Sequence, residues 1–327
     1  MTTLRSLVRR APVAALALLG ASQGGAQEYP ARPLRIIVSQ AAGSSVDILG
    51  RLIAARLTDA WGQQVVVENR PGANAIIGME LAARARPDGY TLAMVVPSAM
   101  TTNQFIYKKL PYDPLRDFAP ITQSTAIAFV LVANPALPVK SVKDLIALSK
   151  ARPGELNYGS SGIGNLTHLA GELFGLGAGV KAVHVPNKGD TPALLDVMTG
   201  QTAFMFSTMP VAVPQIQGGK LRLLAVCGTS REAGFPDVPT LVETGLRDVV
   251  IQGWSGMAAP VGTSAAIIAK LQKEIARYLL AAEMKEQLAR QGAEPVGSTP
   301  EQFSTFIRAE IEKWSRVIKS AGLYNSQ

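Results

Sequence analysis

Short apolar strands alternate with amphipathic helices along most of the chain, and this alternation constrains the fold more than any other feature of the sequence. The segment 34–39 (LRIIVS) is short, rich in β-branched residues and followed by a Gly/Ser cluster, which is typical of a buried strand. Residues 46–60 then carry apolar side chains at the spacing of one helix face. Since strands that alternate with helices build parallel sheets covered on both faces, the pattern predicts an α/β fold.

The alternation continues in two sheet-forming blocks, which a helical tail follows. Strands are expected at 34–39, 65–68, 91–96, 129–133, 156–158, 180–185, 203–206 and 221–226, and helices at 46–60, 76–84, 142–149, 166–176 and 192–198. After Pro260 the pattern is helical only, with helices expected at 264–280, 283–290 and 300–321. A chain of 327 residues is long enough for two domains, so we predict two α/β lobes.

The first 26 residues have the order of a secretory signal peptide. Three arginines within the first ten residues precede an apolar run over 11–21, and small residues at 24–26 suit a cleavage site. The apolar run is well below the roughly 20 residues that a membrane span needs. We therefore expect residues 1–26 to be removed and the mature protein to be soluble in the periplasm.

Charge and the counts of metal-ligating residues argue against several classes of function. The net charge is +8, but the basic residues are scattered and aromatic residues make up only 6%, so a nucleic-acid partner is not expected. The single cysteine, Cys227, excludes an internal disulfide and is expected to be buried in an apolar strand. His168 and Glu172 are spaced i,i+4 on a predicted helix but lack a third metal ligand. We expect no metal and no cofactor.

Two loops between a strand and a helix, 40–47 (QAAGSSVD) and 158–165 (YGSSGIGN), are rich in Gly and Ser and contain no Lys or Arg. In α/β sheets, ligands bind at the carboxyl ends of the strands, where these loops lie. Glycines let the backbone approach a ligand closely, and the free N–H groups at a helix N-terminus favour an anion. The candidate ligand-binding residues in the two loops are Gln40, Ala42, Gly43, Ser44, Asp47, Ser160, Ser161, Gly162, Gly164 and Asn165.

These loops allow two interpretations. They form a pair of cradles that hold a carboxylate between two lobes, or they are ordinary turns in which Asp47 and Asn165 cap the helices that follow. The residues alone leave both interpretations open.

Seven longer motifs resemble those of one family. They are 66–73 (VVENRPGA), 87–92 (PDGYTL), 108–113 (KKLPYD), 117–120 (DFAP), 168–174 (HLAGELF), 184–189 (HVPNKG) and 292–299 (GAEPVGST). Together, in this order and over essentially the whole mature chain, they resemble the Bug-type substrate-binding proteins of tripartite tricarboxylate transporters.

The resemblance implies a type II periplasmic binding protein fold, in which two lobes joined by crossing strands close over a ligand cleft. Residues 27–125 plus 253–327 would form the first lobe, and residues 126–252 the second. Family ligands are small carboxylates, which include dicarboxylates, tricarboxylates, acidic amino acids and aromatic acids. In many members, backbone amides, hydroxyls and bridging waters of the two loops hold the carboxylate. The family also implies delivery to the membrane subunits of a secondary transporter, and we expect a monomer.

The sequence departs from the usual family motifs at positions that bear on the ligand. Gln40 stands where the family usually has an aromatic residue and Ser44 where it has a glycine, so the first cradle is expected to be more polar. Asn187 replaces the usual tyrosine of the motif 184–189, which would open the pocket or add an amide donor. The candidate set is completed by residues that follow strands, namely Ser98, Ser207 and Thr208.

Motifs of enzymes are absent from the sequence or incomplete. There is no G-x-S-x-G or H-E-x-x-H motif, and the run from Gly162 lacks the third glycine of a dinucleotide-binding loop. Trp254 could stack on a ligand or pack at a hinge or in the core. We assign no catalytic residue and expect a receptor rather than an enzyme. Two alternatives stay open, a ligand-presenting subunit for a membrane sensor and an extracytoplasmic hydrolase of a small acid or ester.

Overall fold

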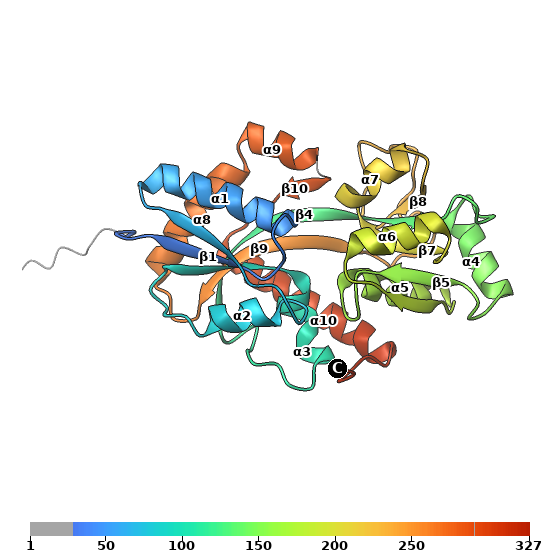
Figure 1. The fold of residues 1–327 in the computed structure, drawn as a ribbon, viewed down its shortest axis with the longest axis horizontal. Helices are drawn as coiled ribbons and strands as arrows, with labels where there is room; N and C mark the ends of the chain where they lie inside the picture. The colour runs from blue at the N-terminus through green and yellow to red at the C-terminus, as the bar shows by residue number, and fades with distance from the viewer. Residues whose placement is uncertain (1–28, 291) are drawn as a thin grey trace, which may run out of the picture.

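Two lobes lie side by side and are joined by long strands that run from one lobe into the other (Figure 1). The computed structural model describes residues 29–290 and 292–327, so the predicted signal peptide lies outside the described residues. One sheet passes through both lobes in the order β2-β1-β3-β9-β4-β7-β5-β6, and β8 and β10 also pair with β4. The predicted α/β fold with two lobes is confirmed.

The first lobe is built on a parallel sheet with helices on both faces (Figure 1). Its central strand β1 pairs in parallel with β2 on one side and β3 on the other. Helix α1 turns Leu49, Ile53 and Leu57 into the core because these residues recur every three to four positions. The elements of this lobe are β1 (Leu34–Val38), α1 (Ser45–Trp61), β2 (Val65–Asn69), α2 (Ile76–Ala83), β3 (Thr91–Val95), α8 (Ala265–Leu279) and α9 (Ala282–Ala289).

The second lobe repeats this plan around β5, which pairs in parallel with β6 and β7. Helices α4 and α5 contribute to the core on one face of its sheet, and α6 and α7 to the core on the other. The elements of this lobe are α4 (Val142–Ala151), β5 (Asn157–Ser160), α5 (Leu166–Ala178), β6 (Val183–Pro186), α6 (Asp190–Thr199), β7 (Phe204–Thr208), α7 (Met209–Gln217) and β8 (Arg222–Val226).

The lobes are connected by two long antiparallel strands, β4 (Phe118–Ala133) and β9 (Gln252–Pro260). Residues 118–128 of β4 pair with β9, and residues 129–133 pair with β7 of the second lobe. A strand that is shared in this way positions the two sheets relative to each other.

A third connection is the last helix, α10 (Pro300–Ser320). Its first half places Phe303 and Ile307 in the core of the first lobe, and its second half places Trp314 and Ile318 in the core of the second. The lobe boundaries expected from the resemblance assign all of α10 to the first lobe, and they stay a proposal. The packing shows that α10 contributes to the cores of both lobes.

Several elements differ from the sequence pattern. The strand expected at 129–133 is the end of the much longer β4, and the strand β9 had no predicted counterpart. The expectation of helices alone after Pro260 is wrong, because β10 pairs antiparallel with β4. Short elements that the pattern did not predict are η1 (Ser98–Thr102), α3 (Asn103–Ile106), α7 with its two prolines, and β10 (Ala293–Pro295).

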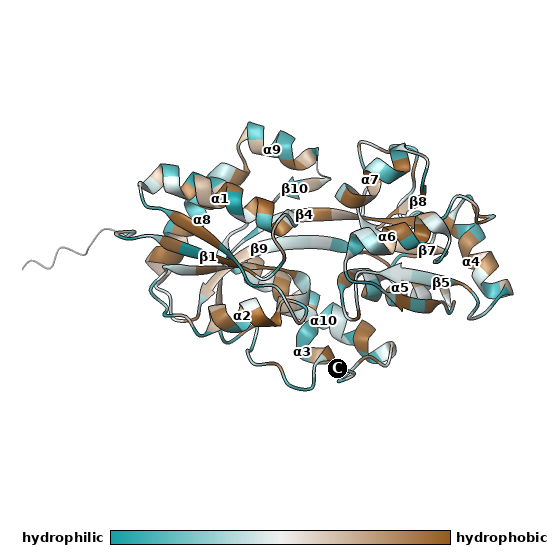
Figure 2. Cartoon of the chain, in the orientation of Figure 1, coloured by the Kyte–Doolittle hydropathy of each residue, from teal (hydrophilic) through white to brown (hydrophobic). Residues whose placement is uncertain are grey.

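Apolar residues concentrate in the sheets and on the helix faces that cover them (Figure 2). Cys227 is buried, as expected, but it lies directly after β8 rather than within the strand. Of the helices within residues 29–290 and 292–327, none combines the length and the apolar character that crossing a membrane requires.

Candidate functional site

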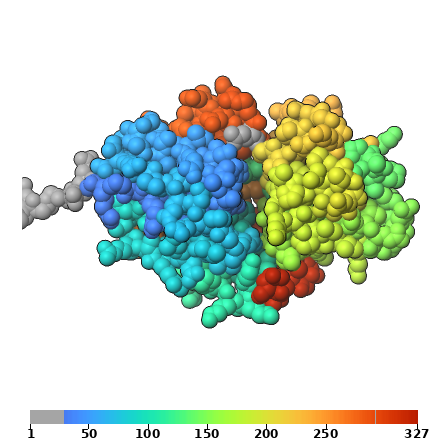
Figure 3. Space-filling view, viewed as in Figure 1, coloured from blue at the N-terminus to red at the C-terminus, as the bar shows by residue number. Residues whose placement is uncertain are grey.

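The two predicted loops lie at the ends of the lobes that face each other. Each follows the carboxyl end of a parallel strand, β1 in the first lobe and β5 in the second, and each leads into a helix (Figure 1). Figure 3 shows the surface hollowed along the line where the two lobes meet. Since ligands of α/β sheets bind at such strand ends, this hollow is the candidate ligand cleft.

The first loop is fixed by the start of α1. Ser44 is the N-cap, and its side chain accepts a hydrogen bond from the Asp47 backbone N–H at 3.2 Å. The expectation that Asp47 is the cap is therefore wrong, since Asp47 lies three residues inside the helix. Gly43 has φ +81°, a conformation that favours glycine, and it lies exposed at the tip of the loop.

The Asp47 side chain fixes the conformation of the first loop through hydrogen bonds. Its buried carboxylate accepts hydrogen bonds from the Gly43 N–H at 2.8 Å, from Asn69 Nδ2 at 2.8 Å and from Arg51 Nε at 3.1 Å. Burial acts to raise the pKa of Asp47, but the hydrogen bonds from Arg51, Gly43 and Asn69 outweigh it and leave the pKa lowered. Asp47 was predicted to contact a ligand, but its geometry is that of a residue that positions the loop.

The second loop begins α5 with Asn165 as its N-cap, so the capping interpretation of this residue is confirmed. Gly162 (φ +136°) and Gly164 (φ +73°) both have backbone conformations that side chains rarely allow. Gly164 also lies against the first lobe, because Thr102 Oγ1 donates to its carbonyl at 3.4 Å. A Cβ added to Gly164 would lie 2.6 Å from Ile106 Cδ1.

Both histidines of the chain lie beneath this loop. Their rings stack with centroids 3.7 Å apart. His168 Nδ1 accepts the Gly164 N–H at 3.0 Å, and His184 Nε2 lies 2.5 Å from Ser160 Oγ. Burial, and then the neighbouring His184, lower the pKa of His168 to about 3, and burial lowers the pKa of His184 to about 4. Both rings are therefore neutral near pH 7, and each holds the loop through one hydrogen bond, in which His168 is the acceptor.

Ser160 and its neighbour Ser161 have different surroundings. Ser160 is wholly buried and bound to His184, so its hydroxyl supports the loop from inside. Ser161 is half-buried, and its hydroxyl contacts Thr167 Oγ1 at 2.8 Å. Of the two predicted serines, Ser161 is the one placed to reach a ligand.

An acidic residue that the sequence analysis did not select lies beside Ser161. Asp190 begins α6, is half-buried, and accepts a hydrogen bond from Thr208 Oγ1 at 3.5 Å. Burial raises the pKa of the Asp190 carboxyl and outweighs the neighbouring hydroxyls of Ser161 and Thr208. An acid in the first turn of a helix is so common a stabilising feature that sequence alone gave no reason to place it in the cleft.

The other predicted residues are distributed around the same strand ends. Gln40 is half-buried, and its carbonyl accepts Asn69 Nδ2 at 3.1 Å. Ala42 is exposed beside Gly43, Ser98 is half-buried at the start of η1, and Ser207 is buried in β7. Asn187 donates through Nδ2 to Asp196 at 2.9 Å, so this amide hydrogen is used within the second lobe rather than offered to a ligand.

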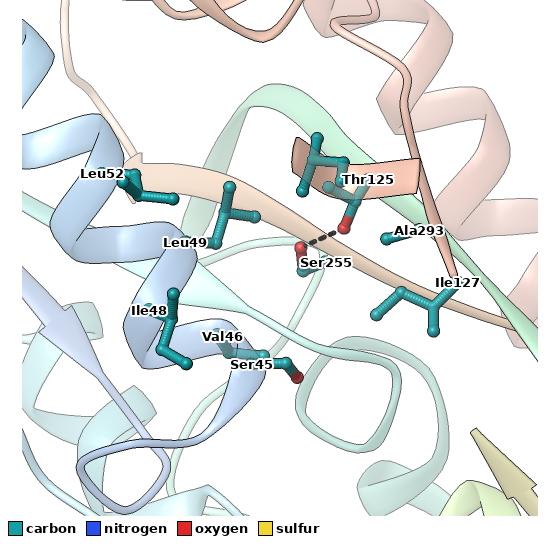
Figure 4. A pocket seen from close by; sticks show the side chains of 10 residues that line it. Ser45, Val46, Ile48, Leu49, Leu52, Thr125, Ile127, Ser255 and Ala293 are labelled. Carbon is teal, nitrogen blue, oxygen red and sulfur yellow. Dashed lines mark hydrogen bonds between the residues drawn. The ribbon is translucent and has the colours of Figure 1, made fainter. Parts of the chain in front are cut away.

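A small cavity separates α1 from the crossing strands (Figure 4). Its volume is about 20 Å³, close to that of one water molecule, and it is lined by Ile48 and Leu49 on one side and by Thr125 and Ser255 on the other. The two hydroxyls lie 2.7 Å apart in a buried hydrogen bond. This cavity is too small for a solute, and Ser45 and Val46 of the first loop also line it.

Two other interpretations are resolved by packing. Trp254 is buried against Phe303 and Phe306 of α10, so it is a core residue and not a stacking surface for a ligand. The second concerns the i,i+4 pair His168 and Glu172 as metal ligands. Glu172 instead accepts a hydrogen bond from the Tyr158 hydroxyl at 2.6 Å. In the part of the chain that the structure describes, no cluster of three or more His, Cys, Asp or Glu could hold a metal ion.

Comparison with known proteins identifies the family. A model described as the tripartite tricarboxylate transporter family receptor matches residues 49–323. The chain belongs to this family of receptors. It is 39% identical over 298 residues to protein BugT of Bordetella pertussis, with 91% of each chain covered.

Solved structures support the same assignment. Rpa4515 of R. palustris, determined with adipate, has a TM-score of 0.83 and 35% identity, over 90% of this chain and 99% of that one. MatC of Rhodopseudomonas palustris, with bound malate, has a TM-score of 0.78 and 29% identity, over 89% and 99%. The resemblance to Bug-type receptors and the two-lobed periplasmic binding fold are thereby confirmed. The receptors of this family are solute-binding proteins, and this chain is one of them rather than an enzyme.

Proposed function

We propose that this receptor binds a small carboxylate in the periplasm and delivers it to the membrane subunits of a tripartite tricarboxylate transporter. The ligand would be a dicarboxylate, a tricarboxylate, an acidic amino acid or an aromatic acid. Membership of the receptor family supports the transport role, and the adipate and malate bound to two related proteins support the ligand class.

The observation that carries the proposal is the pair of loops at the facing ends of the lobes. Neither 40–47 nor 158–165 contains a Lys or Arg, and each begins a helix of at least three turns, α1 or α5. The unpaired N–H groups in the first turn of a helix and the helix dipole attract an anion without a cationic side chain. Two such helix starts, one from each lobe, suit a carboxylate held between the lobes.

The test is calorimetric titration with carboxylic acids and with their amides or methyl esters. We expect the neutral derivative of the best ligand to bind at least about tenfold more weakly, which is roughly 1.4 kcal/mol. The reason is that an acceptor-only anion satisfies N–H donors that the neutral derivative satisfies poorly. Equal affinity for acid and amide would contradict this role of the loops.

A variant of Ser161 localises the effect. Ser161→Val places a bulky apolar side chain beside Asp190 at the face of the second loop, and we expect it to weaken binding tenfold or more. Ser230→Val, at an exposed serine of another loop in the same lobe, is the matched control and should bind normally. Ser160 is unsuited to this test, because its replacement would also remove the partner of His184.

The two alternative functions give different outcomes in the same experiment. A hydrolase would convert its ligand, so a new product in the titrated sample would contradict a receptor. The wholly buried Ser160 argues against this, because a hydroxyl that no solvent reaches cannot attack a substrate, although it lies beside His184. A sensor subunit would bind the ligand unchanged but co-purify with a membrane sensor in place of the transporter subunits.

A further inference from the structure

Asp190 and Asp47 occupy comparable places in the two lobes, but their surroundings differ. Both are acidic residues in the first turn of a helix that begins at the cleft, α6 and α1. The charge of Asp47 is compensated by Arg51 and by two further N–H donors. Within the described residues, the Asp190 carboxylate forms no ion pair and accepts no hydrogen bond from a backbone N–H. Its side-chain neighbours are the hydroxyls of Ser161 and Thr208.

The fold explains why Asp190 lies at the cleft. The segment between β6 and α6 continues the sheet ladder, since the Asn187 N–H donates to the Ser160 carbonyl at 2.8 Å and the Gly189 N–H donates to the Ser161 carbonyl at 3.2 Å. Gly189, with φ +118°, then turns the chain into α6. Asp190 is thereby held beside the second loop.

Three side chains from three different strand ends therefore meet at one point. Ser161 follows β5, Asp190 follows β6, and Thr208 ends β7. Two of these, Ser161 and Thr208, are candidate ligand contacts on sequence grounds. An ionised carboxylate that is partly removed from water and lacks a cation is costly, and a cation placed beside it would recover that cost.

We propose that Asp190 selects the ligand, and that the natural ligand carries a cationic nitrogen, such as a primary ammonium group, in addition to its carboxylate. This inference rests on the proposed function, because the carboxylate is still held by the N–H groups of the loops. A ligand nitrogen would donate to the Asp190 carboxylate, with the hydroxyls of Ser161 and Thr208 beside it. A second carboxylate at the same place would meet like charge, so simple dicarboxylates are expected to bind less well.

The experiment compares pairs of acids that differ only by an amino group. The probes are glutamate and glutarate, 4-aminobutyrate and butyrate, and 3-(aminomethyl)benzoate and 3-methylbenzoate. They are screened by thermal shift and then measured by calorimetry at pH 7.5. We expect the best-binding pair to favour the amino compound by at least tenfold.

Two variants assign this preference to the residue. Asp190→Asn keeps the size of the side chain and removes its charge, and it should reduce the preference to threefold or less while the deaminated acid binds as before or more tightly. Asp190→Ser should do the same and serves where the asparagine variant does not fold. Asp144→Asn is the matched control, because Asp144 is also a first-turn acid of the second lobe, but its carboxylate accepts the Lys140 N–H at the start of α4. It should leave the preference unchanged.

The outcomes separate this inference from the proposed function. If acids bind but the amino group gives no gain in wild-type protein, the role of Asp190 is overturned and the carboxylate receptor stands. If a dicarboxylate binds more tightly than its amino counterpart and loses affinity as the pH rises, a protonated Asp190 donates to a carboxylate, which also overturns the inference. If none of these acids binds but the calorimetric titration with other carboxylic acids finds a ligand without a cationic nitrogen, the inference is overturned and the carboxylate receptor stands. If no carboxylic acid binds, both proposals fail.

Discussion

The stacked pair His168 and His184 is the residue-level feature with the clearest consequence for stability. Both rings lie beneath the second loop and each forms a hydrogen bond with it, His168 as the acceptor of the Gly164 N–H and His184 with Ser160 Oγ. Protonation of either ring would place a charge in a buried stack, and protonation of His168 at Nδ1 would also remove the acceptor of the Gly164 N–H. They are the only histidines of the chain, so their titration can be followed without interference from other imidazoles.

We expect the free energy of unfolding to decrease as the pH falls below about 6.5. The pKa of His184 is lowered to about 4 and that of His168 to about 3, so the unfolded chain binds more protons than the folded chain throughout this range. The loss between pH 7.5 and pH 5 should be roughly 1–3 kcal/mol, measured by urea unfolding. The raised pKa values of Asp190 and Glu232 act in the opposite direction and reduce the net effect.

The variants His168→Asn and His184→Gln provide the control. Asn Oδ1 can replace the His168 Nδ1 acceptor, and the Gln amide can replace His184 Nε2 as acceptor or as donor, and neither side chain can gain a proton in this pH range. Each variant should flatten part of the pH dependence. A wild-type stability that stays constant from pH 7.5 to pH 5 would contradict the assignment.

At this scale the sequence predicted the place of the site better than the role of each residue. Both loops lie at strand ends as predicted, because Gly/Ser clusters after strands signal them directly. Asp47 and Ser44 are three residues apart, and the hydrophobic pattern does not locate the first residue of α1 closely enough to decide which of them is the N-cap. Asp47 has a cationic partner four residues along its own helix, Arg51. The surroundings of Asp190 come from Ser161 and Thr208, which are distant in the sequence, so the pattern did not reveal them.

Among the secondary-structure elements, the start of α1 shows how one carboxylate stabilises a whole loop. Asp47 connects the loop tip at Gly43, the second turn of α1 at Arg51 and the end of β2 at Asn69. The loop geometry therefore depends on this residue much more than on the N-cap alone.

Asp47→Ala should destabilise the protein by roughly 2–3 kcal/mol, because it removes a buried, charged acceptor of three hydrogen bonds. Ser44→Ala removes only the cap and should cost about 1 kcal/mol. Chemical unfolding of both variants measures the difference. If both substitutions cost the same, Asp47 contributes no more than a local helix-start interaction.

The regular strands and helices follow from local patterns, and the elements that the patterns missed have identifiable causes. The first part of β4, 118–128, mixes polar and apolar residues because it crosses between lobes, so it lacks the uniform apolar run of the other strands. Helix α7 contains Pro210 and Pro214, which read as breakers. The three-residue strand β10 exists only because β4 lies beside it, and this contact spans more than 160 residues of sequence.

In the whole molecule, the two lobes are linked in a way that permits bending but not free rotation. The strands β4 and β9 pass between them, α10 contributes to both cores, and Thr102 contacts the second loop across the boundary. Our candidate hinge positions lie on these strands, at Thr125 and at Gln252-Gly253. At position 253 the strand packs closely against Phe129, because a Cβ added to Gly253 would lie 2.8 Å from Phe129 Cε2. A residue larger than glycine would therefore force Phe129 to move.

We expect the ligand to bring the lobes closer together. Each loop supplies only half of the N–H donors, so the ligand binds the closed arrangement more tightly and shifts the population towards it. The measurement uses spin labels at Ala60→Cys on α1 and Leu195→Cys on α6, both exposed positions in different lobes. The distance between the labels should shorten when the cognate acid saturates the protein. The native Cys227 is buried and should not be labelled.

A pair of labels within one lobe distinguishes closure from local rearrangement. Labels at Ala60→Cys and Lys285→Cys lie on α1 and α9 of the first lobe, and their distance should stay constant with ligand. A constant distance in the pair between lobes, with binding confirmed by calorimetry on the same labelled sample, would contradict closure from the arrangement seen here. Closure would also give the membrane subunits a shape that only the loaded receptor presents, which is how binding at the two loops would be converted into delivery.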